Sequence, residues 1–275
     1  MTAPPSADAD RRTDWLGTVH DRVHARPRIA CLVPSLTETL FALGVGDALV
    51  ARTGFCIHPR AHARSVQKIG GTKDPDLARL RDLAPTHLVV NVDENRREDV
   101  EAAREFVPHI VVTHPQGPED NVRLVTLLGA IFAAEAAAGE CVRRLSAALD
   151  ELDAAVATLP TEHVLYLIWR KPWMSVARTT YVSATLARAG WLTLPQASGQ
   201  RYPVIDAADA AWREAERILL STEPFAFRER DAIAMRETTA RPVMLIDGEW
   251  TSWYGVRAIT GLRALAGLRR SLASR

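Results

Sequence analysis

The sequence predicts an α/β protein with two lobes, each built around a parallel sheet, and one long helix that joins them. Short apolar runs alternate with amphipathic segments in residues 28–116, and the same alternation returns in residues 161–275. Such alternation is typical of βα units with parallel strands. Residues 117–160, between the two stretches, are rich in Ala and Leu instead. These three observations predict two Rossmann-like lobes and a linking helix.

The first lobe begins with the apolar run IACLV at residues 29–33, which has the composition of a buried strand. Further strands are expected at residues 49–51, 87–92 and 109–113. Helices are expected at residues 34–44, 74–83 and 96–106. Ser35 and Glu38 have the spacing of a capping box, and Gly44 is placed to end the first helix.

The linking segment, residues 117–160, is expected to form a single helix. Glu119 and Asp120 suit a helix N-terminus, and no proline follows before Pro160. Gly129 and Gly139 weaken the helix only modestly. About 40 helical residues at 1.5 Å each would span roughly 60 Å, far more than an ordinary globular helix. We therefore expect a rigid backbone helix between the lobes.

The second lobe repeats the order of strands and helices. Its strands are expected at residues 163–169, 217–221 and 242–246. Its helices are expected at residues 180–190, 207–215 and 256–270. The last helix carries Ile259, Leu262 and Leu265 on one side, which is the pattern of a helix packed on a core.

Charge and composition exclude several classes of function. The 275 residues carry a net charge of +1, which gives no indication of a nucleic-acid surface. The three cysteines are widely spaced and form neither a disulfide framework nor a CxxC metal motif. No run of about 18 apolar residues predicts a membrane span. Residues 1–27 are polar, without the apolar region of a secretory signal, so we expect a flexible N-terminal arm and a cytoplasmic location.

Aromatic residues are concentrated in loops that follow the predicted strands. In open α/β sheets, ligands bind at the carboxyl ends of the strands. The loops in question are PSLTE at 34–38, GFCIHP at 54–59, RKPWM at 170–174 and DGEWTSWYG at 247–255. Phe55, Trp173, Trp250 and Trp253 would line a cleft between the lobes and suit a large, flat, partly apolar ligand. The alternative is that these rings cover the edges of the core.

Polar residues of the same loops leave several alternatives open. His58 and Cys56 do not supply the three or four ligands of a protein-built metal site. Either one suits a single axial contact to a metal that an organic ligand already chelates, and a Cys–His catalytic pair is the other alternative. Arg170 can meet a carboxylate or phosphate of a ligand, or lie at a solvated rim.

Two segments carry a resemblance to a known family. RIACLVPSLTETLFALGVGDALVARTGFCIHP and QKIGGTKDPDLARLRDLAPTHLVV resemble the class III periplasmic binding proteins, also called helical-backbone metal receptors. These are the substrate-binding receptors for vitamin B12, haem and iron–siderophores in ABC transporter import. The resemblance extends over about residues 28–270. It is strongest to the cobalamin-binding branch, where the aromatic positions of the corrin cleft match Phe55, Tyr202 and Trp250.

The resemblance implies a binding protein for a metal–organic chelate, with no cofactor of its own. The chelate would be a cobalamin-like corrinoid, an iron–siderophore or haem. Family members contact the permease through one acidic residue on each lobe, and the matching positions here are Ala78 and Ala208. We therefore expect a receptor-like protein that does not dock on a permease.

Two other functions stay open on the same scaffold. One is a cofactor-processing or chelatase-like enzyme, which would use His58, Asp247 or Glu249 as its titratable group. The other is a receptor that binds Zn or Mn directly through histidines. Few histidines fall in the candidate loops, which argues against the second.

Overall fold

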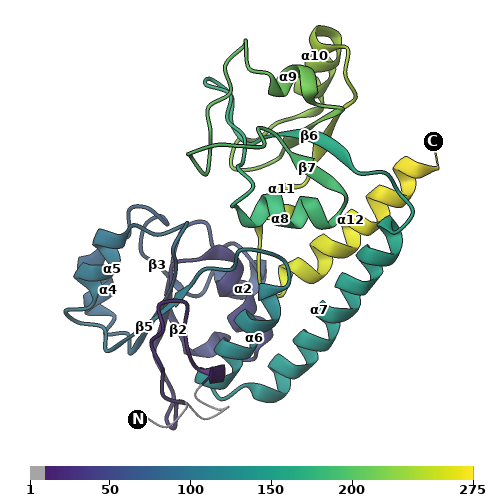
Figure 1. Cartoon of the computed structure of the whole chain (residues 1–275). Coiled ribbons are helices and arrows are strands. Elements are labelled where there is room, and N and C mark those ends of the chain that lie inside the picture. Colours follow the sequence, from purple (N-terminus) through teal and green to yellow (C-terminus); the bar gives the residue numbers. More distant parts are fainter. Residues whose placement is uncertain (1–9, 275) are drawn as a thin grey trace, which may run out of the picture. The chain divides into compact units, whose positions relative to one another are not determined.

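The structure is a computed structural model in which residues 10–274 are described. The chain forms two compact units (Figure 1). The first contains the chain up to Pro115, Asp120–Leu145 and the short segment Tyr254–Val256. The second contains Gln116–Glu119, Ser146–Trp253 and the chain from Arg257 onward. The division is discontinuous in sequence, in contrast to the consecutive lobes that the sequence predicts.

The first unit is built on a five-stranded parallel sheet with the order β3-β2-β1-β4-β5. Its strands are β1 (Ile29–Cys31), β2 (Leu49–Arg52), β3 (Gln67–Lys68), β4 (His87–Asn91) and β5 (His109–Thr113). The apolar runs of the sequence correctly predicted four of them. β3 was missed because its two residues, Gln67 and Lys68, have no apolar signal and extend the sheet only by pairing with β2.

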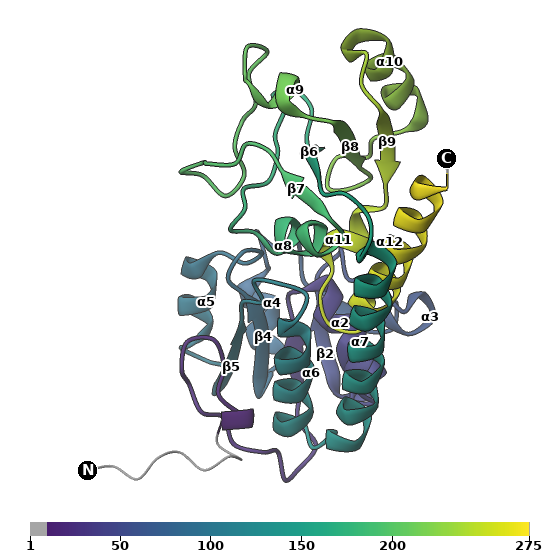
Figure 2. The same ribbon diagram turned by 45° about the vertical axis from the view of Figure 1, so that its right-hand side comes forward.

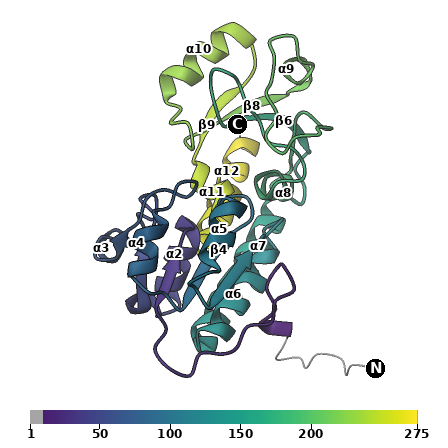
Figure 3. The ribbon, with the colours of Figure 1, turned by 90° about the vertical axis from the view of Figure 1, so that its left-hand side faces the viewer.

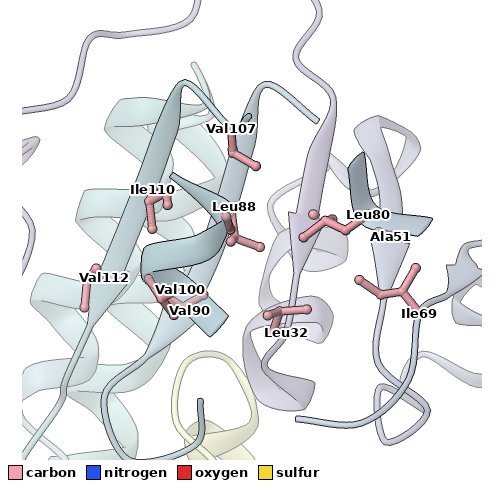
Figure 4. Packing of buried hydrophobic residues seen from close by; sticks show 12 residues of the cluster. Leu32, Ala51, Ile69, Leu80, Leu88, Val90, Val100, Val107, Ile110 and Val112 are labelled. Carbon is pink, nitrogen blue, oxygen red and sulfur yellow. The ribbon is translucent and has the colours of Figure 1, made fainter. Parts of the chain in front are cut away.

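Alternate residues of these strands form the core on one face of the first sheet. Leu32, Leu88, Val90, Ile110 and Val112 all belong to one buried cluster, which Figure 4 shows from close by. The cluster also includes buried residues of the helices α4 (Leu77–Asp82) and α5 (Arg97–Ala103). The period-two spacing along each strand puts these side chains on a common face.

The helix after β1, α2 (Pro34–Ala42), begins two residues earlier than a capping box at Ser35 requires. Its N-cap is Val33, and no side chain caps it. The predicted capping box is therefore wrong, because Ser35 lies inside the first turn of the helix. Gly44 does follow the end of the helix in a left-handed conformation, with φ 79°, as its position predicted.

The expected single linking helix is two helices, α6 (Asp120–Ile131) and α7 (Glu135–Val156). Ala133 adopts a left-handed conformation with φ 57°, and the Ala134 amide donates to the Gly129 carbonyl at 2.8 Å. A Cβ at position 129 would overlap Ala138, so glycine allows the two helices to pack closely. Figures 1 and 2 show α6 and α7 side by side. This packing offsets the strain at Ala133, and it cannot be read from helix propensity.

The N-terminal segment after residue 9 packs on the first unit. Asp14 is buried, and its carboxylate accepts hydrogen bonds from the amides of Leu16 (2.8 Å), Thr18 (3.0 Å) and Val112 (3.1 Å). His20 Nε2 lies 3.1 Å from the same carboxylate. Burial acts to raise the pKa of Asp14, but these hydrogen bonds hold it below its ordinary value. The expected flexible arm is thus corrected for residues 10–27, while residues 1–9 lie outside the described part of the chain.

The second unit is built on a four-stranded parallel sheet with the order β7-β6-β8-β9. Its strands are β6 (Glu162–Leu167), β7 (Trp191–Thr193), β8 (Arg217–Ser221) and β9 (Val243–Ile246). Strands β6, β8 and β9 can be followed in Figure 3. The three residues of β7 were not predicted, and they pair along β6 only.

The helices of the second unit include two that the sequence did not predict. They are α8 (Tyr181–Arg188), α9 (Ala211–Glu214), α10 (Glu229–Thr239), α11 (Gly248–Ser252) and α12 (Arg257–Ala273). The missed ones are α10, which is polar, and α11, which lies within the aromatic stretch after β9. The shorter elements of the first unit are the helix α3 (Arg60–Ala63) and the 3₁₀ helix η1 (Gly46–Ala48). Within residues 10–274, none of the helices is long and apolar enough to cross a membrane.

Candidate functional site

The order of strands reverses once in each sheet. The reversal lies between β1 and β4 in the first sheet and between β6 and β8 in the second. Open α/β sheets bind ligands outside the carboxyl ends of their strands at such switch points. We call the loops at these carboxyl ends the first edge (residues 53–58 and 92–95) and the second edge (residues 168–173, 222–223 and 247–253). Each edge is a candidate site.

The first edge has an apolar surface. Phe55 and Ile57 follow β2 and are 63% and 47% exposed, and Val92 follows β4 and is 45% exposed. A fold normally buries side chains of this kind, and exposed apolar groups gathered at one end of a sheet are typical of a binding surface. Phe55, the aromatic residue predicted for this loop, is therefore available for contact with a ligand.

A buried network of neutral polar groups lies beneath this surface. Asn95 Oδ1 accepts a hydrogen bond from the Asn91 amide at 2.8 Å, and Asn95 Nδ2 donates to the carbonyls of Thr72 (3.0 Å) and Leu32 (3.3 Å). Asn91 Nδ2 donates to Thr113 Oγ1 at 3.3 Å. Asn95 therefore joins the loops that follow β1, β3 and β4, so that the first edge has a defined shape.

The two candidate axial ligands of the first edge differ in accessibility. Cys56 is fully buried, and its Sγ lies 3.1 Å from Thr37 Oγ1 and 3.2 Å from Thr53 Oγ1. Burial raises the pKa of the Cys56 thiol. Because its side chain is fully buried, Cys56 is not accessible to a metal carried by a ligand at this surface, so the structure does not support this alternative. His58 is half-buried. Over residues 10–274, no group of three or more His, Cys, Asp or Glu side chains is arranged to hold a metal ion.

The second edge brings together only part of its predicted aromatic set. Trp173 packs into the core cluster of the second unit, with its ring stacked on Phe227 (centroids 6.1 Å apart) and edge-on to Trp212 (5.9 Å). Its position supports the alternative that this ring covers the core. Arg170 pairs with Asp231 at 3.0 Å and lies over the Trp173 ring at 5.8 Å. The predicted cation is thus already paired with a carboxylate.

Two more exposed rings lie in the loop of Trp173 and in the segment that pairs with it. Trp169, two residues after β6, is 39% exposed and was not selected from the sequence. Tyr202 is 40% exposed and lies in a segment that pairs with the loop after β6. The Ser175 amide donates to the Pro203 carbonyl, and the Ile205 amide donates to the Trp173 carbonyl. The signal for Trp169 was its place at the end of an apolar run, which was interpreted as part of the strand.

The stretch after β9 forms the helix α11, capped by Asp247, whose side chain accepts from the Glu249 amide at 3.0 Å. Trp250 is half-buried, and the backbone around it packs against Gly261 of α12. Figure 2 shows α8, α11 and α12 close together. Trp253 follows α11 and is half-buried. Asp247 thus has the role of a helix cap, one of its two predicted alternatives.

Sequence reasoning missed a carboxylate at the second edge, Glu223. It lies two residues after β8, and its Oε1 accepts hydrogen bonds from Trp253 Nε1 at 2.8 Å and Ser252 Oγ at 2.7 Å. Burial raises the pKa of Glu223; Ser252 and Trp253 oppose this shift, and Glu249 and Asp247 add to it. The available signal was an acidic residue two positions after an apolar strand, in the sequence RILLSTE.

Known proteins resemble the chain in sequence and in fold. Residues 29–241 match the family described as periplasmic binding protein. The vitamin B12-binding protein of Vibrio parahaemolyticus is 21% identical over 226 residues, which cover 82% of this chain and 75% of that protein. The solved structure of the periplasmic vitamin B12 binding protein BtuF of Vibrio cholerae has a TM-score of 0.77 and 16% identity, covering 90% of this chain and 98% of that one. The periplasmic haem-binding protein RhuT of Roseiflexus sp. RS-1 has a TM-score of 0.75 and 18% identity, covering 90% and 100%.

The chain belongs to the periplasmic binding protein family. The resemblance to the class III members is confirmed, and so is the expected fold of two α/β lobes with parallel sheets. The predicted cytoplasmic location is contradicted, because the family and these solved structures are periplasmic binding proteins. That prediction relied on the absence of an apolar stretch in residues 1–27, and such an absence does not outweigh the family match.

Proposed function

We propose that the chain binds a metal–organic chelate with the exposed rings and aliphatic side chains of its first and second edges. The observation that carries the proposal is the exposure of Phe55, Ile57 and Val92 at the first edge and of Trp169 at the second, together with Tyr202 in the segment that pairs with the loop after β6. Chelates such as corrinoids and haem present broad apolar faces, against which aromatic side chains bury large areas at low entropic cost.

The relatives support a chelate over other apolar ligands. Two similar proteins bind vitamin B12 and a third binds haem, according to their names. A cobalamin-like corrinoid, haem and an iron–siderophore are therefore the candidate ligands. Since residues 10–274 contain no cluster that could hold a bare metal ion, the metal would arrive already chelated. His58 is the residue that would approach it, because Cys56 is buried.

The proposal is tested by incubating the purified chain with hydroxocobalamin, haemin or a ferric siderophore and separating free ligand by size exclusion. We expect one chromophore to elute with the protein and to quench tryptophan fluorescence. If none of the three co-elutes at micromolar concentrations, the proposal fails.

A variant separates binding at the edge from adsorption to apolar surface. Phe55→Ala is expected to weaken binding roughly tenfold, since one ring stacked on a ligand contributes about 1–3 kcal/mol. Ile233→Ala is the matched control, because Ile233 is also exposed (47%) but lies on α10 rather than in a loop after a strand. Equal loss in both variants would indicate non-specific adsorption.

Permease docking is a separate prediction from the sequence. Ala78 and Ala208, at the presumed docking positions, are exposed in the structure, in α4 and in the turn before α9. We propose that these alanines weaken docking on an ABC permease. A pull-down of a cognate permease by the wild-type chain, undiminished relative to an Ala78→Glu/Ala208→Glu variant, would contradict this.

A further inference from the structure

Glu223 follows β8, one of the two strands at the switch point of the second sheet, and it contacts Trp253 of the second edge. Its Oε1 accepts from both Trp253 Nε1 and Ser252 Oγ. Its Oε2 has no hydrogen-bond partner among residues 10–274 and is not among their fully buried, unpaired atoms. The carboxylate therefore holds the indole with one oxygen and has the other open to solvent.

The backbone around Glu223 is fixed by the surrounding chain. Ser221 Oγ donates to the Glu223 carbonyl at 2.6 Å, and the Gly248 amide donates to Thr222 Oγ1 at 3.0 Å. A Cβ at position 248 would overlap Glu223 Cγ, so only glycine lets the first turn of α11 lie against this side chain. The position and direction of the Glu223 carboxylate are thus set by β8 and α11 together.

The Trp253 ring is held from two sides. Its Nε1 donates to Glu223, and the Arg257 guanidinium of α12 lies 5.6 Å from its centroid. Arg257 also pairs with Glu249 at 3.6 Å. A tryptophan that served only to fill space would not require a hydrogen bond to a half-buried carboxylate, because a neutral acceptor would bind the indole without desolvating a charge.

The electrostatic setting of Glu223 is unfavourable for its charge. Burial raises its pKa, the negative charges of Glu249 and Asp247 add to this shift, and Arg257, which lies over the Trp253 ring, is paired with Glu249. Tyr166 of β6 completes the surroundings, with a pKa raised to about 12, first by burial and also by Glu223 and Asp247. Carboxylates kept in such settings are concentrated at functional sites.

We infer that Glu223 is a positioning residue for ligand binding, which fixes the Trp253 ring in the orientation that contacts the chelate. The inference rests on the proposed function and assigns to it a residue pair, Glu223 and Trp253, that acts as a unit. An ionised carboxylate is a stronger acceptor for the indole N–H than a protonated one. Ligand affinity should therefore fall as the pH decreases through a pKa that lies above 4.5, the ordinary value for Glu.

The test is a double-mutant cycle on the full chain, with cyanocobalamin or haemin as probe, whichever the wild type retains. Glu223→Ala and Trp253→Phe are each expected to raise Kd roughly tenfold, as for loss of one hydrogen bond to a charged group. The double variant should be no weaker than either single one, since both remove the same contact. Glu237→Gln, an exposed acid on α10, is the charge control and should leave Kd unchanged.

A conservative variant separates positioning from a purely structural role. Glu223→Gln retains the acceptor oxygen, so it should keep Kd within about threefold of wild type at pH 7 and remove the dependence on pH. If Glu223→Ala fails to fold, Trp253→Phe together with Glu223→Gln completes the test.

Three results would overturn the inference. These are additive losses in the double variant, an unchanged pH profile in Glu223→Gln, and wild-type affinity in Trp253→Phe. Each leaves the proposed function standing as long as the wild type binds the probe. A wild-type chain that binds neither probe nor a ferric siderophore overturns the proposed function itself.

Discussion

The first and second edges occupy equivalent places in two parallel sheets, yet different forces hold their loops. At the first edge, neutral amides and hydroxyls form the buried network around Asn91 and Asn95, and the exposed side chains are apolar. At the second edge, a carboxylate, Glu223, holds a tryptophan, Trp253, beside an arginine. The comparison shows that parallel sheets of the same kind can hold their edge loops in two ways. One uses neutral groups that do not titrate, and the other uses a carboxylate that does.

The largest effect is expected at the first edge, from Asn95→Leu. The substitution leaves the Asn91 amide and the carbonyls of Thr72 and Leu32 without their side-chain partner in the interior. We expect the free energy of unfolding to fall by about 3 kcal/mol. Urea denaturation measures this, and a loss below about 1 kcal/mol would show that the network is not what holds the first edge.

A smaller effect is expected at the second edge, from Tyr166→Phe. The Tyr166 hydroxyl donates to Ser221 Oγ at 2.9 Å and lies 2.7 Å from Thr251 Oγ1. Both hydroxyls keep other partners, since Ser221 donates to the Glu223 carbonyl and Thr251 to that of Gly248. The free energy of unfolding should fall by about 1 kcal/mol. A loss as large as that of Asn95→Leu would mean that the two edges are held equally strongly.

The dependence of stability on pH should distinguish the edges more sharply. The pKa of Glu223 is raised in the folded state, so the folded chain binds its proton more tightly than the unfolded chain. Its contribution is therefore most favourable below pH 4.5, the unfolded value, and is lost as the pH rises through the folded pKa. The free energy of unfolding of Glu223→Gln, relative to that of the wild type, should therefore increase as the pH rises through the folded pKa of Glu223. Thermal melts at several pH values test this, and a constant difference between the two proteins would contradict it.

The smallest effect on stability is expected from Phe55→Ala. The ring is 63% exposed, so its removal should change the free energy of unfolding by no more than about 0.5 kcal/mol. The same variant should weaken ligand binding, which would separate function from stability at the first edge. A loss of several kcal/mol in a thermal melt would show that the ring packs on the protein instead.

Sequence patterns predicted the main strands and helices well, because the signal for a strand or a helix lies within a few neighbouring residues. The apolar runs at 29–33, 87–92 and 109–113 became β1, β4 and β5, whose side chains are buried on both faces of the sheet. The prediction of a single linking helix failed at Ala133, where a residue of high helix propensity takes a left-handed conformation. Nothing at that position predicts the break, because its stabilisation comes from α7 packing back on α6.

The sequence predicted which loops carry the candidate site, but it predicted only some of the residues that are accessible there. The rule of carboxyl ends identified the loops that carry Phe55 and Trp253. It could not separate Phe55, which is exposed, from Cys56, its buried neighbour, or recognise that Trp173 stacks on Phe227 from a distant loop. Glu223 was missed because its meaning depends on Trp253, which lies 30 positions further along the chain.

The sequence by itself determined the α/β class, the parallel strands and the loops that carry the candidate site, because periodicity and turn residues act over a few positions. Its motifs also identified the family. Only the tertiary structure decided which side chains of those loops are accessible, where the long helix breaks and which carboxylate holds a tryptophan. Burial and hydrogen bonding between distant segments set these features, and such contacts exist only once the sheets have formed.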